Sequence, residues 1–164
     1  MPEHHTPKAA SPEAATPDPR LRLAFAVLTE AGIITQLATA LLEAHLPKGF
    51  VAAQFSVLNH LATRPAGQTP LRIARAFQVP KTSMTHSLAV LERAGLVETA
   101  PNPEDGRSKL IRITPAGLAF RARTLAALAP EMARSLAALE HGTLETLLPH
   151  LTHLRETLDT ARDG

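Results

Sequence analysis

The sequence contains no cysteine, tyrosine or tryptophan, and each absence excludes a class of chemistry. Without cysteine the chain can form no disulfide framework, thiolate zinc site, cysteine nucleophile or thiol redox switch. Its only aromatic residues are five phenylalanines, which is little material for an aromatic ligand cage or a base-stacking platform. No uninterrupted apolar stretch approaches the roughly 20 residues that span a bilayer, so we expect no membrane segment. The start of the chain lacks a basic region followed by an apolar core, which predicts a cytoplasmic location.

The net charge is small, but the charges are unevenly placed. The 164 residues include 17 Lys and Arg against 15 Asp and Glu, for a net charge of +2, and this length predicts one domain. Between Arg64 and Arg112 there are eight basic and four acidic residues, a net charge of +4. The rest of the chain has nine basic and eleven acidic residues and is therefore net negative. Such a concentration of positive charge indicates binding to a phosphate backbone.

The composition favours helices, because 25 Leu and 29 Ala greatly outnumber the 11 Val and Ile. Apolar spacing, turn residues and prolines predict four helices, a β-hairpin and two further helices, so we expect a mainly α fold with a small hairpin. We divide the chain into a disordered Pro- and Ala-rich tail (1–17), an N-terminal helix (18–47), a helix-turn-helix with a hairpin (50–114) and C-terminal helices (115–162). The two hairpin strands are expected at 96–99 and 109–113.

The predicted helix at 81–94 has two contrasting faces. Placed at 100° per residue, Met84, Leu88 and Leu91 form one apolar stripe. The opposite face is small or polar and consists of Thr82, Thr85, His86, Ala89 and Arg93. Two short helices joined by a tight turn and followed by a hairpin describe a winged helix-turn-helix, whose second helix presents such a face to the DNA major groove. The alternative is that this face is only the solvated side of an amphipathic helix.

Two stretches, Leu88–Val97 and Asp105–Gly117, resemble the multiple-antibiotic-resistance regulator (MarR) family of transcription factors. The second stretch matches the family wing, in which an Asp-x-Arg pair leads through a strand into Leu/Ile-Thr-x-x-Gly. The resemblance covers about residues 20 to 160. It implies a winged helix-turn-helix flanked by long dimerisation helices, and a homodimeric regulator, most simply a repressor, of a pseudo-palindromic operator on double-stranded DNA.

The resemblance also implies roles for individual residues. Arg107 matches the wing arginine that enters the minor groove, and Asp105 matches the residue that orients it; the alternative is a surface salt bridge between them. Lys81 and Arg93 are interpreted as phosphate contacts, and Pro80 stands where the family usually has a Ser-type helix cap. The full set of expected DNA-binding residues is Lys81, Thr82, Ser83, Thr85, His86, Arg93, Asp105, Arg107 and Lys109.

Other functions receive weaker support from the sequence. A winged-helix protein-interaction module without DNA binding is the main alternative. We expect no enzyme, because the sequence contains no Walker-type loop, Gly-x-Ser-x-Gly or His-Glu-x-x-His motif. We expect no metal or other cofactor, since His150, His153 and Glu156 lie mostly on the outward face of their predicted helix. The family resemblance implies response to a small aromatic or phenolic effector, which the sequence does not identify.

Overall fold

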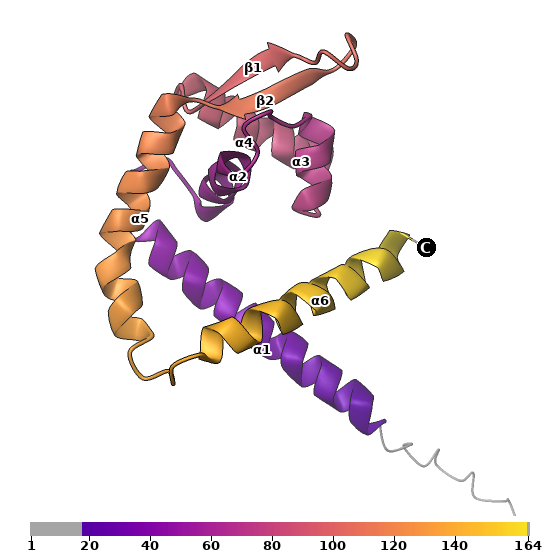
Figure 1. Cartoon of the computed structure of the whole chain (residues 1–164), viewed down its shortest axis with the longest axis vertical. Helices are drawn as coiled ribbons and strands as arrows, with labels where there is room; N and C mark the ends of the chain where they lie inside the picture. Colours follow the sequence, from indigo (N-terminus) through magenta and orange to yellow (C-terminus); the bar gives the residue numbers. More distant parts are fainter. Residues whose placement is uncertain (1–17, 164) are drawn as a thin grey trace, which may run out of the picture. The chain divides into compact units, whose positions relative to one another are not determined.

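The computed structural model describes residues 18–163, so the predicted tail at 1–17 lies outside the described residues. The order of elements is four helices, a two-stranded hairpin and two helices, as predicted (Figure 1). The chain divides into two units, 1–41 and 42–164, which we describe separately. The elements are α1 (Pro19–Glu43), α2 (Ala52–Ala62), α3 (Pro70–Ala76), α4 (Lys81–Arg93), β1 (Val97–Pro101), β2 (Lys109–Ile113), α5 (Pro115–Ser135) and α6 (Thr143–Asp163).

The first unit is dominated by α1, which buries none of its residues. By length and composition alone this helix could cross a membrane, although core helices of soluble proteins and signal sequences meet the same criteria. The expectation that no segment is long and apolar enough is therefore wrong. The helix contains no long uninterrupted apolar run, because residues such as Thr29, Gly32 and Gln36 separate its apolar residues without adding charge.

The second unit has its hydrophobic core between α2, α3, α4, the hairpin and the first half of α5. Leu58, Leu61, Ile73 and Leu91 are almost completely inaccessible to solvent. The predicted apolar stripe of α4 points into this core, and Met84, Leu88 and Leu91 are all buried, as expected. Phe120 of α5 closes the core and stacks at a tilt against Phe50, with ring centroids 5.0 Å apart.

Two Thr-Pro pairs start helices, as the sequence predicts. The Thr69 hydroxyl accepts a hydrogen bond from the Arg72 backbone N–H at 3.3 Å, and Pro70 occupies the first helical turn of α3. The Thr114 hydroxyl accepts one from the Gly117 N–H at 3.0 Å, with Pro115 in the first turn of α5. Both hydroxyls thus satisfy N–H groups that have no partner within the helix.

The hairpin pairs β1 and β2 in antiparallel register from Val97 opposite Ile113 to Pro101 opposite Lys109. The first strand runs two residues beyond the predicted 96–99, because its pairing continues through the residue opposite Lys109. A single bridge between Gln68 and Ile111 attaches the segment before α3 to the hairpin. Figure 1 shows the hairpin extending past the helices it covers, with its loop at the far end.

The C-terminal helices expose much apolar surface. Leu118 and Leu125 on α5 are more than a third exposed, and so are four leucines of α6 before its last turns. Those four are Leu144, Leu147, Leu148 and Leu151. Each of these helices contains a proline, Pro130 in α5 and Pro149 in α6, and continues through it.

Candidate nucleic-acid interface

The outward face of α4 is the largest part of the candidate site. Thr82, Thr85, His86 and Arg93 are all exposed, as is Ala89 between them. The opposite face of the same helix is buried in the core, so the orientation of the outward face is fixed by packing. Small side chains on this face allow close approach to a flat or grooved partner. The structure therefore brings together the α4 residues that the sequence singled out.

The N-terminus of α4 has no side-chain cap. Pro80 occupies the capping position and makes no side-chain hydrogen bond, as predicted from the sequence. The first bond of the helix runs from the Met84 N–H to the Pro80 carbonyl at 3.1 Å. The N–H groups of Lys81, Thr82 and Ser83 consequently have no partner within the helix. Together with the positive end of the helix dipole and the Lys81 ammonium, they favour a bound phosphate.

Two side chains on this face bond to their own helix. The Thr85 hydroxyl donates to the Lys81 carbonyl at 2.8 Å, and the Arg93 Nε donates to the Ala89 carbonyl at 3.2 Å. Thr85 therefore presents its methyl group outward. The Arg93 contact uses one of the five donors of the guanidinium, and the terminal amino groups remain available for a phosphate.

At the tip of the hairpin, the Asp105 carboxylate accepts a hydrogen bond from the backbone N–H of Arg107 at 3.0 Å. The Ser108 N–H closes the same turn by donating to the Asp105 carbonyl at 3.0 Å. Within residues 18–163 there is no ion pair between the side chains of Asp105 and Arg107. Asp105 thus positions Arg107 through the backbone, and the exposed guanidinium extends from the loop. Lys109 follows two residues later, exposed at the start of β2.

A further set of hydrogen bonds, not predicted from the sequence, stabilises the wing loop. The Asn102 side chain donates to the Ser108 hydroxyl at 2.7 Å and accepts from the Glu104 N–H at 3.1 Å. The signal was present, because Asn ahead of Pro in a polar loop is typical of a side-chain-stabilised turn. A further missed contact joins the wing to α4, where the Thr99 hydroxyl donates to the Glu92 carboxylate at 2.7 Å.

The hairpin is held against α2 and the segment between α2 and α3 by contacts that the sequence did not reveal. Gln68 exchanges two backbone hydrogen bonds with Ile111, at 3.1 and 2.8 Å. Its side-chain oxygen lies 2.8 Å from Nε2 of His60 on α2. The Arg112 Nε donates to the Ala66 carbonyl at 3.2 Å. These bonds fix the position of the wing relative to the helix-turn-helix.

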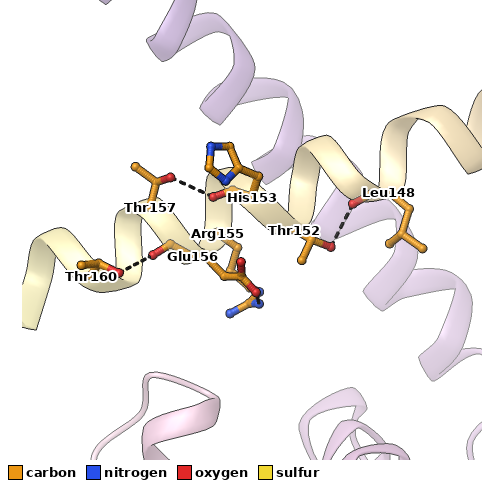
Figure 2. A network of polar contacts seen from close by, with 7 residues as sticks. All are labelled: Leu148, Thr152, His153, Arg155, Glu156, Thr157 and Thr160. Carbon is orange, nitrogen blue, oxygen red and sulfur yellow. Dashed lines mark hydrogen bonds and ion pairs between the residues drawn. The ribbon is translucent and has the colours of Figure 1, made fainter.

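The α6 residues considered for metal binding are arranged differently. Glu156 pairs with Arg155 at 3.0 Å, and the His153 carbonyl accepts a hydrogen bond from Thr157 at 2.9 Å. In Figure 2 the His153 ring and the Arg155–Glu156 pair point away from each other. In the described part of the chain, no three His, Asp or Glu side chains are grouped as metal ligands would be.

A helix-turn-helix with an exposed polar second helix and a basic wing defines a winged-helix DNA-binding protein. The comparisons agree: residues 49–108 match the model of the MarR family. The multiple antibiotic resistance protein MarR of Escherichia coli K12 is 34% identical over 121 residues, which cover 71% of this chain and 83% of the relative. The chain therefore belongs to the MarR family and is a DNA-binding transcriptional regulator.

Solved structures extend the comparison to the fold. A MarR variant from E. coli in complex with operator DNA is 30% identical, with a TM-score of 0.60, covering 75% of this chain and 91% of that one. The regulator BldR from Sulfolobus solfataricus has a TM-score of 0.74 at 18% identity and covers 84% of this chain and 98% of its own. These matches confirm the predicted fold class, mainly helical with a hairpin wing.

Proposed function

We propose that the protein is a homodimeric repressor that binds a pseudo-palindromic operator, with α4 in the major groove and the wing loop in the minor groove. The observation that carries this proposal is the geometry of α4, whose buried stripe turns an exposed, small and polar face outward. An α-helix with such a face fits the major groove. Operator binding by the related E. coli MarR variant supports the same arrangement.

The proposed roles differ among the site residues. Thr82, Ser83, Thr85 and His86 lie on the first two turns of α4 and contact base edges and nearby phosphates. Lys81, Arg93 and Lys109 contact phosphates, which position the protein without reading sequence. Arg107 enters the minor groove, where a guanidinium responds to groove width and potential, and Asp105 holds the loop that carries it.

The apolar surfaces of α1, α5 and α6 support the dimer. Leu37 on α1 is 67% exposed and Leu148 on α6 is 66% exposed. Threonines on these helices bond to their own backbone, as Thr29 does to Phe25 and Thr152 to Leu148, and so present methyl groups outward. Apolar faces of this extent are expected to be covered by a second copy. A two-fold dimer would place its two α4 helices about 34 Å apart, which is one turn of DNA. A cytoplasmic location follows from this function.

The test is a fluorescence anisotropy titration with DNA from upstream of the protein's own gene, at two salt concentrations. Wild-type protein should bind, and its affinity should fall as salt rises. Arg107→Ala should weaken binding about tenfold and reduce the salt slope by about 1. Arg123→Ala, an equal loss of charge at an exposed position of α5, is the matched control and should bind as wild type does. Equal binding by wild type and Arg107→Ala would refute the wing assignment, and no DNA binding at low salt would favour an interaction module.

A hollow beside α2 is the proposed site of a small aromatic effector. It has a volume of about 530 Å³, and three of its eight described lining residues, Leu42, Phe55 and Phe77, are apolar. Asn59 and Arg64 bring polar groups to the same hollow; Asn59 is held by Arg121 at 2.7 Å, and Arg64 by the His60 carbonyl at 2.9 Å. Phenylalanine rings beside fixed polar groups suit an aromatic acid or phenol.

A panel of aromatic acids and phenols tests this effector site through two measurements, the melting temperature and the operator affinity. A ligand should raise the first and lower the second. Ser56→Leu places bulk at the lining of the hollow and should abolish both responses while preserving operator binding. A response that survives Ser56→Leu places the effector elsewhere.

A further inference from the structure

A second hollow lies between α3 and α6, on a surface that the proposed DNA contacts do not use. Its volume is about 540 Å³. It is lined by Gln68, Arg72, Arg75, Ala76, Gln78, Asp159 and Arg162. The lining thus comes from the segment before α3, from α3 itself, from the turn that follows it and from the last turns of α6.

The lining is strongly basic. Among the described residues that line the hollow, three arginines face one carboxylate, Asp159, for a net charge of +2. Arg72 and Arg75 are three residues apart on α3 and therefore share one face, opposite the buried Ile73. Among the side chains that the structure describes, those of residues 18–162, neither guanidinium has an ion-pair partner. Guanidinium groups present paired N–H donors that match the oxygens of a phosphate.

The carboxylate of Asp159 already has partners inside the chain. It accepts a hydrogen bond from the side-chain amide of Gln78 and lies 3.8 Å from Arg162. Gln78 is the one described residue other than glycine with a positive φ, 56°, a conformation that glycine adopts with less strain. The hydrogen bond to Asp159 accounts for a glutamine at this position, where glycine would be less strained. Since Gln78 lies two residues before Pro80, the hollow is joined to the turn that leads into α4.

We propose that this hollow binds the phosphate group of a small phosphorylated compound, with Arg72, Arg75 and Arg162 as its cationic ligands. The ligand is a small compound free in solution and not the operator backbone. The reason is that α6 forms one wall of the hollow, and the space left there accommodates a discrete group. Among the described lining residues Asp159 is the one opposing charge, and it weakens the attraction for a phosphate. This site is separate from the aromatic hollow beside α2 and does not depend on operator binding.

Isothermal titration of the full-length protein with inorganic pyrophosphate, without DNA and at constant ionic strength, tests the site. Wild type should bind, and the double variant Arg72→Gln/Arg75→Gln should bind at least tenfold more weakly. Asp159→Asn should bind several-fold more tightly, because it removes the opposing charge and keeps a group able to accept the Gln78 bond. Arg134→Gln, an equal charge change at an exposed position near the end of α5, should match wild type.

Two results would overturn the proposal. One is the absence of pyrophosphate binding by wild type at millimolar concentration; loss of operator affinity and salt slope in the double variant would then assign the arginines to the DNA backbone. The other is equal pyrophosphate binding by wild type and the double variant. Circular dichroism of each variant confirms that the fold is retained, and the opposite shift expected for Asp159→Asn cannot arise from unfolding.

Discussion

Gly117 lies so close to Leu96 that a β-carbon on the glycine would stand 2.1 Å from the Leu96 carbonyl oxygen. The same oxygen accepts a hydrogen bond from the Thr114 N–H at 3.1 Å, and the Thr114 hydroxyl donates to the Gly95 carbonyl at 2.7 Å. The start of α5 is therefore locked to the turn between α4 and β1. This contact explains why the wing sequence ends in Thr-Pro-Ala-Gly and requires glycine at its last position.

Gly117→Ala should destabilise the protein by about 3 kcal/mol, because the new methyl group meets backbone that cannot move without breaking the Thr114 bonds. Urea denaturation followed by circular dichroism measures the change. Gly106→Ala is the control: a β-carbon there meets nothing within 4 Å, so stability should change by less than about 0.5 kcal/mol. Equal stability of the two variants would show that the helix start is not tightly packed.

Asp105 should affect DNA binding through the shape of the wing loop. Asp105→Ala removes the acceptor for the Arg107 N–H and should weaken operator binding about fivefold, equivalent to about 1 kcal/mol for a lost hydrogen bond. Asp105→Asn keeps a side-chain oxygen and should restore most of the affinity. Anisotropy titrations of both variants check this, and equal losses would mean that the charge matters rather than the turn.

Substitutions of His86 and Lys81 should have different effects on DNA binding. His86→Ala should reduce discrimination between the operator and altered operators by about 1–3 kcal/mol, since a lost base contact relaxes specificity at one position. Lys81→Ala should weaken binding to all sequences alike and lower the salt slope by about 1. Competition titrations with single-base operator variants separate the two effects. A uniform loss for His86→Ala would move that residue to the phosphate-contacting group.

The exposed leucines of α6 should be required for the dimer. Leu147→Glu/Leu151→Glu places two charges on an apolar face, and sedimentation should show monomers with operator affinity reduced at least a hundredfold. The suitable control is His153→Glu, at an exposed position of α6. Leu110→Glu is not suitable, because Leu110 is a partly buried residue of β2.

Flotation with lipid vesicles tests whether α1 binds a membrane. A wild-type dimer that stays in the soluble fraction supports covering of α1 by protein, whereas vesicle binding would assign α1 to a membrane.

The elements that the sequence predicted well are those with local signals. Thr69-Pro70 and Thr114-Pro115 mark helix starts through their own side-chain chemistry, and the stripe of α4 follows from helical spacing. Contacts between distant segments could not be inferred this way. The Gln78–Asp159 bond joins residues 81 positions apart, and no local pattern reports such a pairing. The potential of α1 to cross a membrane was missed for a different reason, since counting unbroken apolar runs ignores uncharged polar residues.

Because Pro80 precedes α4, no capping side chain accepts the first N–H groups of this helix, and bound DNA can supply the acceptor. In the free protein, water is the available acceptor for the first N–H groups of this helix, and the first turn should fray. A bound phosphate would supply the missing acceptors and hold that turn in place. Amide hydrogen exchange at Thr82 and Ser83 should then slow on DNA by more than at Leu91, whose amide lies within the hydrogen-bonded body of the helix. The first turn of α4 would therefore become fully ordered only when the regulator binds its operator.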